Sequence, residues 1–362
     1  MTKMASTYYM NSTGKEPQST QEGSIGVLLA SCVEMILCLL GGTFGNSLTI
    51  IVICRTKSLQ VVSNFLLASL ALADFLVSVI LVPMRASQHM ALYHGSSVPN
   101  AVVQIAGFIG RVNIIASISN LAAMSIDRYI ALSHPMFYLS SVKFAKGRVC
   151  LVILLIWIFS VAVTSIPKFP GVSDKPFLIF FVAFVLIATV VIAVTYKRIF
   201  KIARKSIRRQ RRSSTLASKV VRLSFTTTLD SRLVRYLDEK EIPQRNRQAY
   251  SQTKERKTAG TIAFVIGAFV VLVYPRIILI LYHFAAPETV QSRLARFWIR
   301  ILLYSNSVVN PALYAWRHKE FKREFRKVLL RCWRCLKCQE RQYLKKTSSN
   351  KTNSTSVLPR NR

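Results

Sequence analysis

Long apolar blocks alternate with shorter polar segments along this chain, and seven blocks are long enough to cross a lipid bilayer as helices. A spanning helix needs about 20 residues to cross ~30 Å of hydrocarbon. The blocks run approximately from Ile25 to Cys54, Asn64 to Met90, Pro99 to Leu132, Val149 to Ile166, Pro176 to Tyr196, Thr258 to Phe284 and Arg296 to Trp316. Backbone polar groups in lipid must bond within their own segment. The pattern therefore predicts an all-α membrane protein, a seven-transmembrane helix bundle.

Lysine and arginine are concentrated in alternate connections between these blocks. The first, third and fifth connections are basic, and the fifth contains the run from Arg208 to Arg212. The second connection, Ala91 to Val98, has no lysine or arginine, and the fourth has only Lys168 and Lys175. Basic connections stay on the cytoplasmic side. The asymmetry thus predicts a multi-pass plasma-membrane protein whose amino terminus is extracellular.

This topology divides the chain into four parts. They are an extracellular tail (1–24), the bundle (25–316, with a long basic third cytoplasmic loop at 200–253), a short amphipathic eighth helix (317–331) and a cytoplasmic tail (332–362). The loop is rich in Ser and Thr, and we expect it to be partly disordered and accessible to kinases. The eighth helix is expected on the membrane surface, because its apolar residues share one face. These residues are Phe321, Phe325, Val328 and Leu329.

The positions of some residues suggest covalent modification. Cys332, Cys335 and Cys338 follow the eighth helix, where palmitoylation is one reading and ordinary reduced thiols are the other. Asn11 opens a glycosylation sequon in the tail predicted to be extracellular. None of the seven cysteines falls in a segment predicted to be extracellular, so we expect no disulfide framework.

The chain of 362 residues carries a net charge of +35, which also raises the question of nucleic-acid binding. Because the basic residues flank the apolar blocks, we assign them to membrane orientation and to attraction by anionic membrane lipid, with no nucleic-acid partner. No nucleophile–base constellation or metal-ligand cluster favours an enzyme. No internal repeat or pair of broken helices favours a transporter.

Polar and charged residues inside the apolar blocks are costly in lipid and therefore indicate function. Asp74 lies mid-way along the second block, the sequence Asp127-Arg128-Tyr129 ends the third, and Glu255 stands where the sixth begins. Further landmarks are Asn46, Trp157, Tyr196, Phe269, Pro275 and the sequence Asn310-Pro311-Ala312-Leu313-Tyr314. In this order and at these depths they resemble the rhodopsin-like (class A) G-protein-coupled receptors, from about Gly41 to Arg331.

The resemblance implies a two-state switch at the cytoplasmic end. In the resting state Arg128 pairs with Asp127 and reaches Glu255. Breaking that link lets the sixth helix swing outward and admit a heterotrimeric G protein. Tyr196 and Tyr314 then turn inward to hold the open form. The remaining switch residues are Tyr129, Asn310 and Pro311, and arrestin and receptor kinases are the further partners implied. The alternative for Glu255 is a solvated position in a run of charged residues.

Asp74 needs a partner within the membrane. Candidate oxygen ligands are Asn113 and Ser117 on the third helix, with Asn306, Ser307 and Asn310 on the seventh. An all-oxygen set suits a hard cation, and in the family this place holds an allosteric sodium ion. The alternative is a protonated Asp74 in a hydrogen-bonded cluster, because burial disfavours a charged carboxylate. We expect no cofactor apart from this ion.

The chain departs from the family pattern near the outer end of the bundle. Val103 stands in place of the usual third-helix cysteine, Ala188 in place of the fifth-helix proline and Val273 in place of the sixth-helix tryptophan. In lacking this cysteine and this proline and in having a short second extracellular loop, the chain also resembles melanocortin-type receptors. Gly110 stands where amine receptors carry an aspartate, so we expect no biogenic amine ligand.

Arginines in the outer halves of four helices are the candidate ligand contacts. They are Arg85, Arg111, Arg276, Arg296 and Arg300, with Tyr304 extending the last stripe. The acids nearby in the sequence pattern are Glu34 and Glu288. Guanidinium groups match carboxylate and phosphate geometry, so we hypothesise one cavity for an anionic ligand. The alternative is that some of these arginines reach lipid headgroups or backbone carbonyls.

These expectations combine into one functional prediction. The chain is a G-protein-coupled receptor that transduces an unknown extracellular ligand, of the anionic class, to heterotrimeric G proteins. A receptor-like protein that signals constitutively or without a ligand is the alternative, and a transporter is a weaker one.

Overall fold

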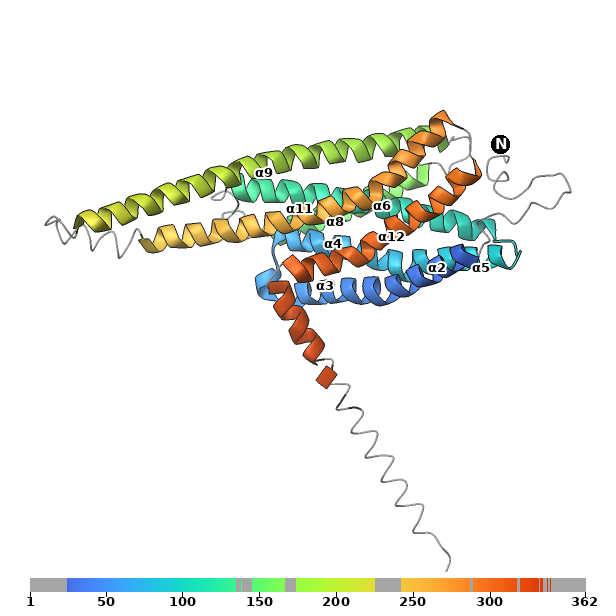
Figure 1. The fold of residues 1–362 in the computed structure, drawn as a ribbon, viewed down its shortest axis with the longest axis horizontal. Helices are drawn as coiled ribbons and strands as arrows, with labels where there is room; N and C mark the ends of the chain where they lie inside the picture. The colour runs from blue at the N-terminus through green and yellow to red at the C-terminus, as the bar shows by residue number, and fades with distance from the viewer. Residues whose placement is uncertain are drawn as a thin grey trace, which may run out of the picture.

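A bundle of long helices forms the protein (Figure 1). The computed structural model describes residues 25–134, 138, 145–166, 174–224, 242–286, 289–317 and 320–331, with a few single positions up to 339. Several sequence predictions fall outside these residues: those for Asn11, Glu288, Cys332, Cys335 and Cys338. The first span joins α2 (Ile25–Leu37), the π-helical η2 (Cys38–Thr43) and α3 (Phe44–Arg55), and a short turn, η3 (Lys57–Leu59), follows.

The remaining spans follow along the chain. The second joins α4 (Val62–Leu76), the π-helical η4 (Val77–Leu81) and α5 (Val82–Tyr93). The others are α6 (Asn100–Ser133), α8 (Ala145–Ser165), α9 (Asp174–Ser224), α11 (Ile242–Ala285) and α12 (Val290–Arg317). The seven predicted blocks are thus confirmed as helices.

Within the described residues, six helices are long and apolar enough to cross a membrane. They are Ile25–Arg55, Val62–Tyr93, Asn100–Ser133, Lys146–Ser165, Pro176–Lys205 and Ala259–Phe284. The seventh span, α12, packs against α11, α3 and α4 although its sequence is more polar. Its polar residues Asn306, Ser307 and Asn310 are buried, at most 4% exposed. These polar side chains of α12 therefore face the interior of the bundle.

The third span, α6, lies at the centre of the bundle. It packs against α4, α8, α9 and α11. Its side chains Ile115, Leu121 and Met124 are fully buried. Because α6 runs the length of the core, it carries both Asn113 in its middle and Arg128 near its end. We call the end of the bundle where Arg128 lies the Arg128 end, and the end where α2 begins the Glu34 end.

The described parts of the connection between α9 and α11 are helical. α9 continues as a helix to Ser224, and α11 begins at Ile242, so both project beyond the other helices (Figure 1). At 1.5 Å per residue the 51 residues of α9 are about 75 Å long, roughly two and a half times the length a span needs. Arg, Lys, Gln, Ala and Leu, which are common in these stretches, are favourable helix residues. A helix that leaves the membrane can therefore continue through them.

Close approach of backbones sets the position of the first span. A Cβ added to Gly42 would overlap the hydroxyl of Ser78, and one added to Gly45 would lie 2.7 Å from the Cβ of Pro311. Both contacts are shorter than side chains tolerate, so glycine is required for this spacing. The first span is thereby held against the second and the seventh.

A further helix, residues 320–331, follows α12 and turns away from the bundle axis (Figure 1). Phe321 and Phe325 are buried at 1% and 7% exposure, whereas Leu329 is 42% exposed. Both phenylalanines thus pack against the bundle, whereas Leu329 is available to a membrane surface, and the prediction that this helix lies on the membrane stays a prediction. On the opposite side, the hydrogen bond from Lys327 to Glu324, at 2.9 Å, holds the pKa of that carboxyl below its ordinary value.

Candidate functional site

Arg128 is bonded to the side chains of Asp127 and Tyr138. Its guanidinium is 2% exposed. Nε donates to Oδ2 of Asp127 at 2.9 Å, and Nη2 donates to the same oxygen. Nη2 also donates to the hydroxyl of Tyr138 at 3.1 Å, and that hydroxyl in turn donates to Oδ1 of Asp127 at 3.3 Å. A charge buried at the end of a helix is thus held against its own helix by one carboxylate and one phenol.

The predicted partner of Arg128 on α11 is Glu255. Glu255 lies on α11, but its side chain is outside the described residues, so the Arg128–Glu255 link stays a prediction. A different contact joins α9 to α11 nearby, because the Tyr196 hydroxyl donates to the carbonyl of Ala259 at 3.4 Å. Tyr129 packs on α9 instead, with the Arg198 guanidinium 5.9 Å from the centre of its ring.

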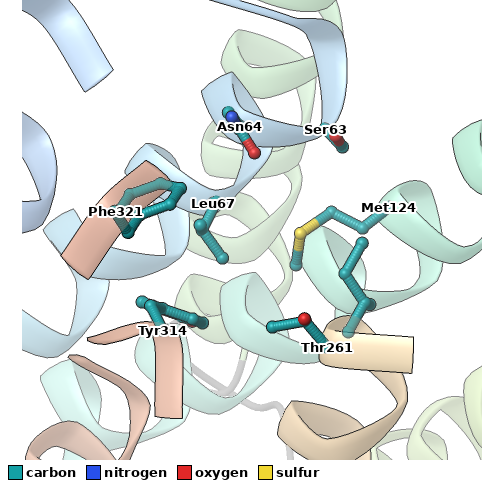
Figure 2. A pocket seen from close by; sticks show the side chains of 8 residues that line it. Ser63, Asn64, Leu67, Met124, Thr261, Tyr314 and Phe321 are labelled. Carbon is teal, nitrogen blue, oxygen red and sulfur yellow. The ribbon is translucent and has the colours of Figure 1, made fainter. Parts of the chain in front are cut away.

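Tyr314 lies beside a small cavity between four spans and the 320–331 helix. The cavity is lined by Ser63, Asn64, Leu67, Met124, Thr261, Ile262, Tyr314 and Phe321. Figure 2 shows Tyr314 and Phe321 on one side of it, with Met124 and Thr261 opposite. The Tyr314 ring lies 6.3 Å from that of Phe321, and its buried hydroxyl has no hydrogen-bond partner. The ring therefore has both space beside it and an unsatisfied group.

Asp74 is fully buried and contacts α12. Ser307 Oγ donates to its Oδ1 at 3.1 Å, and Asn310 Nδ2 donates to its Oδ2 at 2.7 Å. The predicted ligand oxygens on Asn113, Ser117 and Asn306 are buried without a hydrogen-bond partner. The predicted set thus divides into two groups. Two residues donate hydrogen bonds to Asp74, and three have buried oxygen atoms without a hydrogen-bond partner.

Two of the five predicted ligand arginines fall into one cluster at the Glu34 end. Arg300 of α12 lies within electrostatic range of Glu34 on α2 and of His89 on α5. Arg85 also lies within range of His89, and its Nη1 donates to Gln88 Oε1 at 2.8 Å. We call Glu34, Arg85, His89 and Arg300 the outer cluster. It joins the first, second and seventh spans.

The other three arginines have different neighbours. The Arg111 guanidinium lies 5.6 Å from the ring centre of Phe177 on α9. Arg296 Nη2 lies 3.4 Å from Nε2 of His283 on α11. Arg276 is half-buried on α11. The contacts described therefore do not join all five arginines around one point.

Tyr304, the last predicted ligand residue, lies deeper in the bundle. It is 6% exposed and packs in an apolar cluster with Cys38, Val77 and Leu81. At the positions that depart from the family, Ala188 and Val273 are buried in the apolar core.

Sequence reasoning missed two features of these sites. Tyr138 lies beyond the Asp127-Arg128-Tyr129 motif, in a polar connection where a single tyrosine carries no recognisable signal. His89 has no motif around it, and only its spacing of four residues from Arg85 places the two on one helix face. Glu34 was recognised as an acid near the arginines, and its proximity to Arg300 is confirmed.

Four of the seven cysteines lie among the described residues. Cys32, Cys38, Cys54 and Cys150 are all free thiols.

Comparison with known proteins shows a family match over most of the chain. The model of the 7 transmembrane receptor (rhodopsin family) matches residues 45–176 and 172–314. A dopamine D2-like receptor of Drosophila melanogaster is 40% identical over 37% of this chain and 14% of its own length. The alpha-1D adrenergic receptor of Homo sapiens is 25% identical over 87% of this chain and 57% of its own length.

A third relative matches along most of both chains. The 5-hydroxytryptamine receptor 1B of Mus musculus is 27% identical over 84% of this chain and 87% of its own length. The chain thus spans less than two thirds of the first two relatives, and the three do not single out a subfamily. The matched segments contain Asp74, Arg128 and Tyr314, which the structure places inside a helical bundle. This chain belongs to the rhodopsin family of seven-transmembrane receptors.

Proposed function

We propose that this chain is a ligand-activated receptor that couples to heterotrimeric G proteins at the Arg128 end. The observation that carries the proposal is the burial of Arg128, which is 2% exposed and bonded to Asp127 and Tyr138. Charges are kept inside membrane helices mainly where they serve function. A guanidinium that is always charged, held at the mouth of a bundle, is suited to exchange its partners when the bundle opens.

Opening the bundle requires movement of α11 relative to α6 and α9. The contact from Tyr196 to the carbonyl of Ala259 is one link that such a movement breaks. The small cavity beside Tyr314 leaves its ring room to shift, and a shift that brings its unsatisfied hydroxyl to a polar group would give that hydroxyl a partner. Ligand binding would then bias an equilibrium between two packings of the same helices. Arrestin and receptor kinases are further proposed partners of the open form.

Charge supports a topology with the Arg128 end in the cytoplasm of a plasma-membrane receptor. The part of α9 that leaves the bundle there exposes Lys201, Arg204, Lys205 and Arg208. Basic residues next to a span are retained inside and are attracted to anionic lipid. The amino terminus is then extracellular, and the outer cluster faces the ligand.

The ligand class is proposed to be anionic, with Arg85 and Arg300 as its first contacts. These two arginines share the outer cluster, and guanidinium groups bind carboxylate and phosphate with paired hydrogen bonds. The three relatives are named for dopamine, 5-hydroxytryptamine and adrenergic function. Gly110 gives the third helix no carboxylate for an amine, so the ligand of this chain is expected to differ from theirs.

A sodium ion at Asp74 is proposed as an allosteric partner. The donor set fits a hard cation, because it combines one carboxylate with buried oxygens on Asn113, Ser117 and Asn306 that have no hydrogen-bond partner. The ion would supply the positive charge that a buried carboxylate requires.

Activation in cells tests the proposed function. Cells expressing the wild type would be screened with carboxylates, nucleotides, lipid acids and acidic peptides, with G-protein activation as the readout. Arg128→Ala is expected to remove the response at equal surface expression. Arg300→Gln is expected to weaken it without lowering the maximal response, because that residue lies at the Glu34 end, away from Arg128. An unchanged response in Arg128→Ala would contradict the proposal.

A further inference from the structure

The outer cluster contains a buried hydrogen-bond acceptor and a buried hydrogen-bond donor, neither of which has a partner. Oε1 of Glu34 is buried and accepts no hydrogen bond. Nε of Arg85 is buried and donates none, and Nδ1 of His89 is also without a partner. Buried groups of this kind normally have partners, and leaving a charged one unsatisfied costs free energy. The cluster therefore offers an open acceptor on an acid together with an open donor on a base.

Arg85 is fixed in place although its Nε is open. Its Nη1 donates to Gln88, and Gln88 is itself 5% exposed and donates through Nε2 to the carbonyl of Val102 on α6 at 3.4 Å. The guanidinium is thus anchored at one edge to the second and third spans. A planar group held at one edge presents its remaining N–H groups in a fixed direction, as recognition of an anion requires.

Glu34 brings its carboxylate to the cluster from the first span, on α2. α2 packs against α5 and α12, and the Glu34 carboxylate lies within electrostatic range of Arg300. Arg300 therefore partly balances the charge of Glu34. The ring of His89 stands edge-on to Phe297 at 5.0 Å, which closes the cluster with an apolar wall.

We infer that the outer cluster binds a zwitterion, a molecule with an ammonium and an anionic group a few bonds apart. The ammonium would donate to Oε1 of Glu34, and the carboxylate or phosphate would accept from Arg85. A simple anion would leave the Glu34 oxygen unsatisfied and would place a second negative charge beside it. A simple amine would leave Arg85 unsatisfied and would add to the positive charge of two arginines. A zwitterion satisfies both groups at no net charge.

This inference rests on the proposed anion-binding function and makes it more specific. It also explains how the chain differs from relatives named for amines. Gly110 provides no carboxylate on the third helix, but Glu34 provides one on the first. The amine contact would thus be moved to another wall of the bundle and combined with an anion contact.

Binding to the purified full-length receptor in phospholipid-free detergent tests the inference. The probes are the ω-amino acids from glycine to 6-aminohexanoate, each beside the carboxylic acid and the primary amine of the same length. Affinity is read from the rise in the thermal unfolding midpoint with probe concentration. At least one amino acid is expected to bind about tenfold more tightly than its matched acid, the value of a charge-assisted hydrogen bond.

Three variants assign that difference to atoms. Glu34→Gln keeps the shape of the side chain and is expected to remove the preference for the amino acid, while the acid binds at least as tightly as before because a negative charge beside it is gone. Arg85→Gln is expected to weaken both. Glu324→Gln, which changes an exposed carboxylate on the 320–331 helix, is the control and is expected to change neither. In each variant the affinity for the amino acid is compared with the affinity for the matched acid. A general loss of stability would affect both affinities and cannot imitate a change in their ratio.

A zwitterion can come from the water or from a lipid headgroup. A second arm replaces the soluble probes with phosphatidylethanolamine, beside phosphatidylglycerol, in mixed micelles. Stabilisation by phosphatidylethanolamine alone, lost in Glu34→Gln, supports the inference with a membrane source. Equal binding of acid and amino acid in the wild type overturns it, as does a preference that persists in Glu34→Gln.

The outcomes also separate this inference from the function on which it rests. Acid binding that is lost in Arg85→Gln without any preference for the amino acid would leave the anionic ligand class intact. Absence of binding by acids, amino acids and both lipids would contradict the zwitterion and the anionic ligand together. G-protein activation by an uncharged ligand would be compatible with neither ligand proposal but would leave the coupling function standing.

Discussion

At the scale of single residues, the Tyr138 hydroxyl joins the guanidinium of Arg128 to the carboxylate of Asp127. It accepts from the guanidinium at 3.1 Å and donates to Asp127 at 3.3 Å. Hydrogen bonds to charged groups contribute about 1.5–3 kcal/mol each. Tyr138→Phe keeps the ring and removes both bonds, so we expect basal G-protein activation to rise about tenfold.

The measurement is agonist-independent G-protein activation normalised to surface expression. Tyr93→Phe is the matched control, because Tyr93 is exposed at the Glu34 end and the contact of its ring with His94 does not require the hydroxyl. Basal activity that stays at the wild-type level in Tyr138→Phe would show that the hydroxyl does not hold the resting state.

Asp74 carries a second prediction at this scale. A ligand present at ten times its dissociation constant stabilises a folded protein by about 1.4 kcal/mol. Replacing N-methylglucamine chloride by sodium chloride at constant ionic strength should therefore raise the thermal midpoint of the wild type. Asp74→Asn keeps the contact with Ser307 but removes the charge, and its midpoint should not respond to sodium. An equal response in wild type and variant would exclude an ion held by Asp74.

At the scale of helices, the approach of the first span to the second depends on Gly42. An alanine there would overlap Ser78, and overpacking of this kind costs about 1–3 kcal/mol. Gly42→Ala should therefore lower the temperature at which half of the purified receptor remains folded. Gly267→Ala is the control, because nothing lies within 4 Å of the added Cβ and alanine is the better helix residue.

A double variant identifies the cause of the Gly42→Ala effect. Adding Ser78→Gly removes the overlapping side chain and should restore part of the lost stability. If the double variant is as unstable as Gly42→Ala, the contact between the two spans is not the origin of the effect.

The helices themselves were predictable, because hydrophobic length in a membrane leaves few alternatives. Their ends at the Arg128 side were not, since α9 and α11 continue where charge alone suggested disorder. Apolar periodicity ends at the membrane surface, whereas helix propensity does not. The partners of Asp74 were recoverable from sequence because they follow from a motif. Tyr138 and His89 were not, because their roles arise only when distant residues meet.

At the scale of the whole molecule, the two ends of the bundle carry different chemistry. The Glu34 end joins acid and base from three spans, and the Arg128 end holds one buried charge beside a small cavity. Asp74 lies between them and connects α4 to α12. Helices that are rigid along their length can transmit a change at one end to the other, provided that both ends bias the same two packings. The proposed receptor function requires this coupling between the Glu34 end and the Arg128 end.

The most direct test of the account is nucleotide exchange on purified heterotrimeric G proteins by the purified receptor in lipid vesicles. A panel of G proteins would be assayed with the wild type, Arg128→Ala and Tyr138→Phe. The account predicts exchange with at least one G protein in the wild type, more without ligand in Tyr138→Phe, and none in Arg128→Ala. Exchange by Arg128→Ala at the wild-type rate would contradict a switch that depends on this buried arginine.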